Sequence, residues 1–223
     1  DTAIVPEGAH SAVVGNPVRP ALAALAGQPY PLPAEGAVLR ILVLGGSLGA
    51  RIFADVVPAA IGALPEALRA RLLVTQQCRA EDLARTRSAY DSAGVPADLA
   101  PFFPDVAGRL ATAHLVIGRA GASTVAEIAC AGRPSVLVPL PSAIDDHQTA
   151  NARALAAADA AQVFAQADFT PQALTDALVS FLNFPARMAS AAAAAAALAR
   201  PHAARDLADL VMALARRNLA RVS

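Results

Sequence analysis

The sequence predicts an α/β fold, namely a Rossmann-like, doubly wound parallel sheet covered by helices. Three observations support this prediction. Short apolar runs alternate with helical stretches along most of the chain. The runs are apolar at nearly every position, which is typical of strands buried on both faces. Several of them end in a turn of small residues that opens a helix, as expected in βαβ units.

The predicted elements follow one another in a regular order. Apolar runs predict strands over residues 38–44, 72–75, 98–100, 114–118, 135–138 and 161–164. Helices are predicted over residues 50–64, 80–93, 105–113, 123 onward, 147–157, 171–181, 184 onward and 202–217. Before the sheet we expect a short strand over residues 11–14, a helical turn over 21–27 and a proline-containing linker over 28–36.

Composition excludes several classes of protein. At 223 residues the chain suits one large or two small domains. Its formal net charge is zero, so the charge gives no indication of a nucleic-acid partner. All 18 basic residues are arginine, which excludes a Walker lysine, a Schiff-base lysine and a lysine general base.

Cysteine and histidine usage gives no sign of a metal site. Cys78 and Cys130 lie far apart and are expected to be reduced thiols, and the four histidines form no cluster. The alanine-rich segment 189–199 is expected to fill a helix without joining the core. The sequence shows no pattern of a signal peptide and no apolar run of the length that a membrane span requires, so we expect neither in these 223 residues. Because residue 1 is not methionine, we expect the chain to begin partway through a larger protein.

The most informative stretch is residues 119–134, which lies between two apolar runs. Its small residues predict a turn that connects a strand to a short helix. The amino end of such a helix has unpaired N–H groups and a partial positive charge, which favour phosphate. Glu127 lies one turn inside the helix and can accept hydrogen bonds from a sugar hydroxyl pair, so the stretch predicts a nucleotide site. Thr124 and Glu127 also fit a capping box, which is a purely structural alternative.

A second loop, residues 45–50, ends the first strand of the sheet and opens a helix. Its glycines let backbone N–H groups approach a phosphate, and Ser47 can donate a further hydrogen bond. The loop matches neither the dinucleotide-binding glycine pattern nor the P-loop, which argues against NAD and ATP.

A third loop precedes the predicted helix 147–157. Asp145 or Asp146 suits the N-cap of this helix, and His147 is a weak candidate for an acid or base. Gln148 and Asn151 lie on one face of the helix and carry amides suited to sugar hydroxyls. All three loops follow strands of one parallel sheet, at the edge where open α/β sheets bind ligands.

The last helix has an apolar stripe with helical spacing. Leu207, Leu210, Val211 and Leu214 recur at i, i+3, i+4 and i+7. Two interpretations remain open: the helix packs on its own domain, or it packs across onto a second domain.

Four motifs, taken together and in order, resemble the MurG family of glycosyltransferases. The resemblance runs from about Val13 to the carboxyl terminus. The motifs are Gly-Asn-Pro-Val-Arg at 15–19, Gly-Gly-Ser-Leu-Gly-Ala-Arg at 45–51, Arg-Ala-Gly-Ala-Ser-Thr-Val-Ala-Glu at 119–127 and Asp-His-Gln-Thr-Ala-Asn-Ala at 146–152.

The resemblance implies the GT-B arrangement of two Rossmann-like domains, of which this chain is the carboxyl-terminal half. Residues 1–36 would then be the tail of the amino-terminal domain and the linker. Residues 37–200 would form the donor-binding domain, and residues 201–223 a helix packing toward the amino-terminal domain. Substrate-binding positions would be Arg19 at the hinge, Ser47 on the diphosphate, Phe103 with its backbone on uracil, Gln148 on the N-acetylglucosamine, Glu127 on the ribose, and Ala122, Ser123, Thr124, Val125 and Ala126 around phosphate and ribose.

The activity implied by the resemblance is transfer of N-acetylglucosamine from UDP-GlcNAc to undecaprenyl-diphosphate-muramoyl-pentapeptide. This reaction converts lipid I to lipid II in peptidoglycan synthesis, and so contributes to cell-wall biogenesis, cell shape and cell division. It implies no cofactor, no metal and no nucleic acid, and a cytoplasmic enzyme peripheral to the inner face of the cell membrane. The family's amino-terminal glycine-rich loop with its histidine is absent, so no catalytic residue is assigned and the chain alone is expected to be inactive. Leu48 departs from the family's usual glutamine.

Two alternatives remain. The first is another GT-B glycosyltransferase, which would prefer UDP-glucose or a dTDP-sugar over UDP-GlcNAc. The second is a nonenzymatic α/β nucleotide-binding or regulatory module, which would bind nucleotide without a sugar preference.

Overall fold

The computed structural model describes residues 11–46, 50–143 and 146–222, and in them it confirms the predicted doubly wound sheet. All strand pairs are parallel, and the spatial order is β3-β2-β1-β4-β5-β6. The strands are β1 (Leu39–Leu44), β2 (Leu72–Gln77), β3 (Ala97–Ala100), β4 (Leu115–Gly118), β5 (Ser135–Leu137) and β6 (Ala161–Val163).

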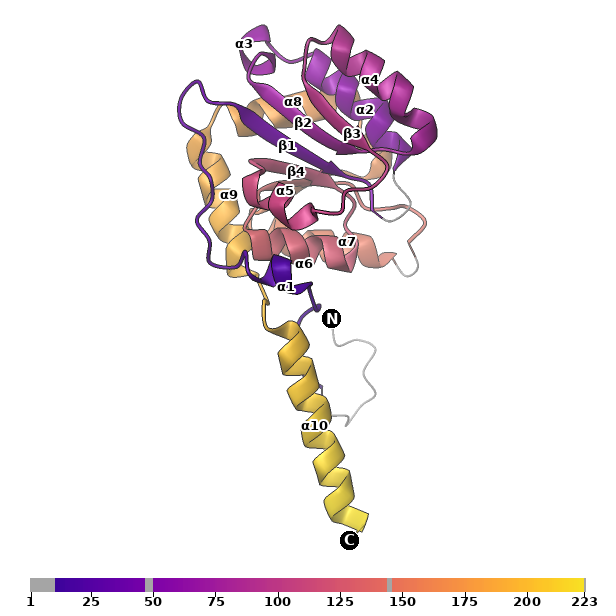
Figure 1. The fold of residues 1–223 in the computed structure, drawn as a ribbon, viewed down its shortest axis with the longest axis vertical. Coiled ribbons are helices and arrows are strands. Elements are labelled where there is room, and N and C mark those ends of the chain that lie inside the picture. The colour runs from indigo at the N-terminus through magenta and orange to yellow at the C-terminus, as the bar shows by residue number, and fades with distance from the viewer. Residues whose placement is uncertain (1–10, 47–49, 144–145, 223) are drawn as a thin grey trace.

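Helices lie on both faces of the sheet, and one long helix projects away from it (Figure 1). Helices α2, α4 and α8 contribute to the core on one face, and α1, α5, α6 and α7 to the core on the other. The helices are α1 (Pro20–Ala23), α2 (Arg51–Gly62), α3 (Glu66–Arg69), α4 (Leu83–Ser92), α5 (Val106–Thr112), α6 (Ala122–Ala131), α7 (His147–Ala157), α8 (Pro171–Leu182), α9 (Pro185–Ala197) and α10 (Ala203–Val222).

Strand β1 shows why the chain forms two core layers. Successive side chains of a strand point to opposite faces of the sheet. Ile41 and Val43 accordingly pack in the layer with α2 and α8, whereas Leu42 and Leu44 pack in the layer with α5 and α6. Because both faces are covered, all four side chains are buried, and the strand reads as a continuous apolar run.

The segment before the sheet differs from its prediction. Residues 11–19 form no strand, since no strand lies beside them in the described sheet, whose edges are β3 and β6. The predicted helical turn is shorter, and α1 covers only residues 20–23. Leu22 and Leu25 are buried in the core layer of α6, and the Tyr30 hydroxyl donates to the His114 carbonyl at 2.8 Å. The segment from α1 to Tyr30 therefore packs on the body of the domain. The short helix α3 was not predicted.

The expectation that the alanine-rich segment stays out of the core is wrong. In α9, Ala191, Ala192 and Ala195 are buried. At the end of α6, Gly132 has a φ of 61°, and a Cβ there would lie 3.2 Å from the Cβ of Ala196. Small side chains on α9 therefore allow the two helices to approach closely. Alanine joins this core because the packing distance leaves no room for a larger residue.

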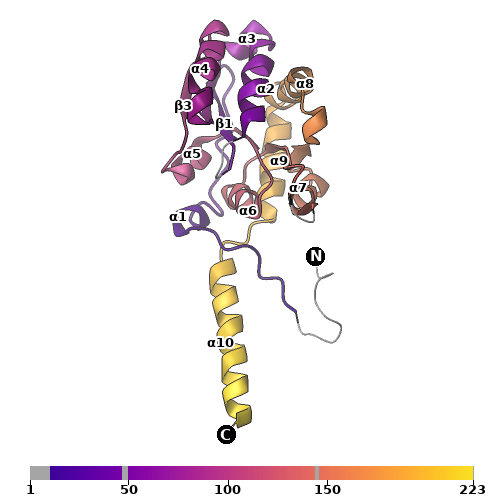
Figure 2. The same ribbon diagram turned by 90° about the vertical axis from the view of Figure 1, so that its right-hand side faces the viewer.

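Helix α10 extends the predicted last helix to residue 222 and stands away from the sheet and its covering helices (Figures 1 and 2). Its side chains at Leu207, Val211 and Leu214 are 42%, 55% and 50% exposed. The interpretation that this stripe packs on its own domain is therefore wrong. Among the described residues, no helix has both the length and the apolarity that a membrane crossing requires.

Candidate functional site

Two adjoining pockets lie at the carboxyl ends of the strands. The larger, of about 630 Å³, is lined by residues that follow β1, β2, β4, β5 and β6. The smaller, of about 160 Å³, shares Gly46 and Thr124 with the larger. We call them the phosphate pocket and the base pocket. The sheet order places β4 beside β1, so the loops after these two strands diverge at the switch point where open α/β sheets bind ligands.

The turn between β4 and α6 lies where the two pockets meet. The N-cap of α6 is Gly121, and no side chain caps the helix. The capping-box alternative is therefore wrong, because Thr124 lies inside the first turn. The first intrahelical bond runs from Val125 N–H to the Gly121 carbonyl, so the N–H groups of the preceding three residues have no helical partner. Ala122, Ser123 and Thr124, which carry these groups, line the phosphate pocket.

Glu127, one turn further along α6, lines the base pocket. Its side chain is only 16% exposed, and Oε1 lies 3.5 Å from Nη2 of Arg19. Burial raises the pKa of the Glu127 carboxyl, and the charge and hydrogen bond of Arg19 oppose that rise. The structure thus brings together Arg19 and Glu127, two predicted site residues that are far apart in the sequence, and within the part of the chain that it describes the carboxylate has one long ion pair.

The phosphate pocket is suited to an anion. Arg51, Arg79 and Arg119 line it, and none of its described lining residues is acidic. Arg79 is partly exposed, with Glu81 as a distant partner at 4.0 Å. Arg119 is more buried, and this burial lowers its pKa.

Arg119 joins three loops beneath the phosphate pocket. Its Nη1 donates to the carbonyls of Val138 and Pro139 at 3.1 and 3.2 Å, and its Nη2 donates to Oε1 of Gln166 at 2.6 Å. These contacts link the turn after β4 to the segments after β5 and β6. The guanidinium therefore helps to shape the pocket.

Helix α7 also holds the turn before α6. Oε1 of Gln148 accepts from the Ala120 and Leu140 N–H groups at 3.3 and 3.0 Å. Nδ2 of Asn151 donates to the Ala120 carbonyl at 3.0 Å. The two amides predicted to meet sugar hydroxyls thus bind backbone in this structure. Asp146 is the N-cap residue of α7, although its side chain caps no N–H group and instead accepts from the Thr149 hydroxyl at 2.6 Å.

The base pocket is largely apolar. Phe102 and Phe103, from the loop after β3, line it together with Leu44 and Val106. Phe102 is 69% exposed, whereas the Phe103 side chain is buried beneath the guanidinium of Arg109. Glu127 lines this pocket but not the phosphate pocket.

Of the remaining predicted site residues, Ser47 and the departure at Leu48 lie outside the described residues. Val125 packs against the core layer behind α6, and neither Val125 nor Ala126 lines the two pockets. Sequence reasoning missed Arg79 and Gln166. Both follow the carboxyl end of a strand, a position that suggests proximity to the site but does not single out a particular residue.

These features define the class of the protein: a Rossmann-like α/β domain with an arginine-lined pocket at its switch point. The family described as "Glycosyltransferase family 28 C-terminal domain" matches residues 40–210. The chain belongs to this family.

Two sequence relatives have the same name, UDP-N-acetylglucosamine–N-acetylmuramyl-(pentapeptide) pyrophosphoryl-undecaprenol N-acetylglucosamine transferase. The protein of Granulibacter bethesdensis is 57% identical over 210 residues, covering 94% of this chain and 55% of the relative. The protein of Rhodospirillum centenum is 58% identical over 201 residues, covering 90% and 53%. The chain spans about half the length of the curated relatives it matches.

Solved structures show a similar fold, and one of them agrees with this assignment. MurG of Acinetobacter baumannii superposes with a TM-score of 0.72 at 36% identity, covering 78% of this chain and 52% of that one. A putative UDP-N-acetylglucosamine 2-epimerase from Listeria monocytogenes gives a TM-score of 0.62 at 14% identity, over 92% of this chain and 54% of that one. The second likeness concerns the fold alone.

Proposed function

We propose that this chain is the donor-binding half of an N-acetylglucosaminyltransferase that converts lipid I to lipid II. Its pockets would hold UDP-GlcNAc, and the sugar would pass to undecaprenyl-diphosphate-muramoyl-pentapeptide. The single observation that carries the proposal is the meeting of the uncapped α6 amino end, the half-buried Glu127 carboxylate and the arginine-lined pocket at one switch point. The names of the relatives support the choice of donor and acceptor.

The proposed donor lies across both pockets. Uracil occupies the base pocket beside the backbone of Phe103, and the ribose hydroxyls donate to Glu127. The diphosphate lies on the N–H groups of Ala122 to Thr124, where the helix end favours negative charge. Ser47 would add a contact to the diphosphate, and Arg19 would contact the donor from the hinge. Gln148 would contact the N-acetylglucosamine.

This arrangement gives the chain a defined part in the chemistry. When the bond between the sugar and the diphosphate breaks, negative charge grows on the departing UDP. The N–H groups at the start of α6 and the arginines that line the pocket would stabilise this charge. The acceptor hydroxyl belongs to lipid I, and the lipid I site and the base that takes the proton belong to the other half of the enzyme, so transfer needs both domains closed over a dry cleft.

The same proposal accounts for the ends of the chain. Residues 1–36 would connect to the amino-terminal domain, and 37–200 would be the donor domain. The exposed apolar stripe of α10 would pack toward the amino-terminal domain. That domain would bind lipid I at the cytoplasmic membrane face.

Calorimetric titration of the 223-residue chain tests the proposal. We expect binding of UDP-GlcNAc and UDP, weaker binding of UDP-glucose and dTDP-sugars, and no transfer to a lipid I analogue. A preference for UDP-glucose or a dTDP-sugar would support another GT-B transferase. Nucleotide binding without a sugar preference would support a nonenzymatic module.

Gln148→Glu sharpens the test of the sugar site. Glutamate keeps an oxygen that can accept from the Ala120 and Leu140 N–H groups, but it loses the amide donor. We expect affinity for UDP-GlcNAc to fall relative to affinity for UDP. Equal losses of affinity for the two ligands would show that Gln148 does not contact the sugar.

A further inference from the structure

The loop after β3, residues 101–104, is held in place by two side chains that the predicted site does not include. We propose that Gln77 and Arg109 are positioning residues that fix this loop in the conformation that distinguishes uracil from cytosine. The inference rests on the proposed function, because it assumes that the base pocket holds the nucleobase. Neither side chain is proposed to contact the substrate.

Gln77 connects the base loop to the phosphate loop. It is the last residue of β2, which lies between β1 and β3, so its side chain stands between the loops that follow those two strands. Its Nε2 donates to the carbonyls of Gly46 and Pro101 at 3.0 and 3.1 Å, and its Oε1 accepts from Gly45 N–H at 3.2 Å. Both amide hydrogens are therefore engaged by backbone. A side chain with no free donor positions its surroundings and does not read a base.

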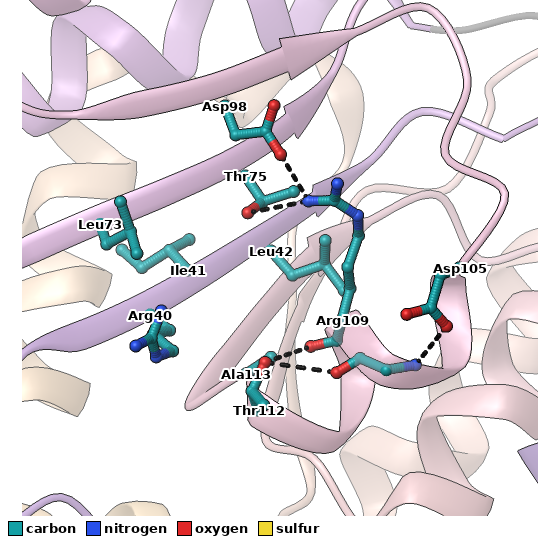
Figure 3. A pocket seen from close by; sticks show the side chains of 11 residues that line it. Arg40, Ile41, Leu42, Leu73, Thr75, Asp98, Asp105, Arg109, Thr112 and Ala113 are labelled. Atoms are coloured by element: carbon teal, nitrogen blue, oxygen red, sulfur yellow. Dashed lines mark hydrogen bonds and ion pairs between the residues drawn. The ribbon is translucent and has the colours of Figure 1, made fainter.

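Arg109 fixes the other end of the same loop. Its Cζ lies 3.9 Å from the centroid of the buried Phe103 ring, a geometry in which cation and ring attract. Figure 3 shows how the guanidinium is held: Nη1 donates to Oδ2 of Asp98 at 2.7 Å and lies 3.5 Å from Oγ1 of Thr75. The loop is thus tied to β3 and β2 through Arg109.

The backbone of Phe103 is left available by this arrangement. Neither its N–H group nor its carbonyl bonds to any described residue. Uracil presents an acceptor at O4 and a donor at N3, whereas cytosine presents a donor at N4 and an acceptor at N3. A loop that offers a fixed pattern of backbone groups therefore favours one base over the other, and the preference depends on how accurately the loop is positioned.

The experiment measures affinities for UMP and CMP by calorimetry on the 223-residue chain and its variants. Gln77→Glu retains the acceptor for Gly45 but places oxygens against the Gly46 and Pro101 carbonyls. We expect UMP affinity to fall about tenfold, the equivalent of one lost hydrogen bond, and the UMP-to-CMP ratio to fall with it. Arg109→Ala should lower the ratio about threefold, in the range of one cation–π contact. Asp98→Ala should also lower the UMP-to-CMP affinity ratio, but by less than Arg109→Ala does.

Matched controls separate positioning from loss of stability. Gln28→Glu makes the same chemical change at an amide that donates to the Ala24 carbonyl, away from both pockets. Arg85→Ala removes an arginine paired with Asp55 and Asp82 that lines neither pocket. Both controls should keep the wild-type ratio even if their Tm changes.

The outcomes distinguish this inference from the function beneath it. If the wild-type chain prefers UMP and the Gln77, Arg109 and Asp98 variants lose that preference, the inference holds. If those variants stay folded and keep the wild-type ratio, Gln77 and Arg109 are structural residues only and the inference is wrong. If the wild-type chain binds neither nucleotide, the proposed function fails first and the inference with it.

Discussion

Helices α8 and α10 have similar apolar stripes, but the stripe of α8 is buried and the stripe of α10 is exposed. Leu174 and Leu178 of α8 are fully buried against the core layer of α2. Leu207 and Val211 of α10 are about half exposed, on a helix that stands clear of the sheet (Figure 2). The two patterns are equally regular in the sequence. The difference is whether a partner surface lies among the described residues of the chain.

The same distinction applies to polar residues. His114 finds its partner inside the chain, since its Nδ1 accepts from Arg40 N–H at 2.8 Å. Glu127 is half-buried with a single long ion pair to Arg19, and its proposed partner is the ribose of a ligand. Residues with internal partners should affect stability when changed, and residues with external partners should affect binding or association.

The largest expected effect is on α8. Leu178→Ala removes a fully buried side chain and should lower the free energy of unfolding by about 2–5 kcal/mol, because it leaves a cavity. Val211→Ala on α10 should change it by less than about 0.5 kcal/mol. Urea unfolding followed by circular dichroism measures both. Equal losses at the two sites would mean that α10 has a partner surface within the chain.

Glu127→Gln comes next. If the carboxylate accepts from ribose hydroxyls, UDP binding should weaken by about 1.5–3 kcal/mol in calorimetry. Burial raises the folded-state pKa of Glu127, so its ionised form at neutral pH does not stabilise the fold, and Tm should be unchanged or higher. Glu35→Gln, in the exposed linker, is the control. A Glu127→Gln variant with a lower Tm and an unchanged affinity for UDP would show that Glu127 has a structural role only.

The pH dependence of the free energy of unfolding tests the internal hydrogen bond of His114. Burial, together with the charges of Arg40 and Arg133, lowers its pKa in the folded protein. The contribution of neutral His114 to the free energy of unfolding is therefore complete above the unfolded-state pKa of about 6.5. It is lost as pH falls below that value, and the free energy of unfolding then falls by at most about 1.4 kcal/mol per pH unit. His114→Asn can still accept from Arg40 N–H and does not titrate, so its stability should depend less on pH between 7 and 5.

The control for this measurement is His202→Asn, at an exposed position just before α10. It should retain the wild-type pH dependence. A wild-type slope in His114→Asn would show that another group causes the acid destabilisation.

The smallest effect on stability is expected for the α10 stripe as a whole. Replacing Leu207, Val211 and Leu214 together by glutamine should change the free energy of unfolding by no more than about 0.5 kcal/mol per site. The same variant should reduce self-association of the chain in sedimentation velocity, because an exposed apolar stripe promotes contact between copies. Unchanged association would show that the stripe does not cause it.

Much of the site could be located from the sequence because its loops carry local signals. The small-residue turn at 119–124 and the glycines at 45–46 identify strand ends that open helices, and the structure places both at the pockets. The sequence could not identify Arg79 or Gln77. A single arginine or glutamine after a strand has no pattern of its own, and its role depends on loops that follow other strands.

The sequence by itself determined the order of strands and helices, because hydrophobic periodicity is a property of neighbouring residues. It also determined that both faces of the sheet are covered, since its strands are apolar throughout. Only the tertiary structure decided that α9 buries its alanines, that Arg19 meets Glu127 and that α10 finds no surface among the described residues. These outcomes depend on distances between segments as much as a hundred residues apart, and no local pattern records such distances.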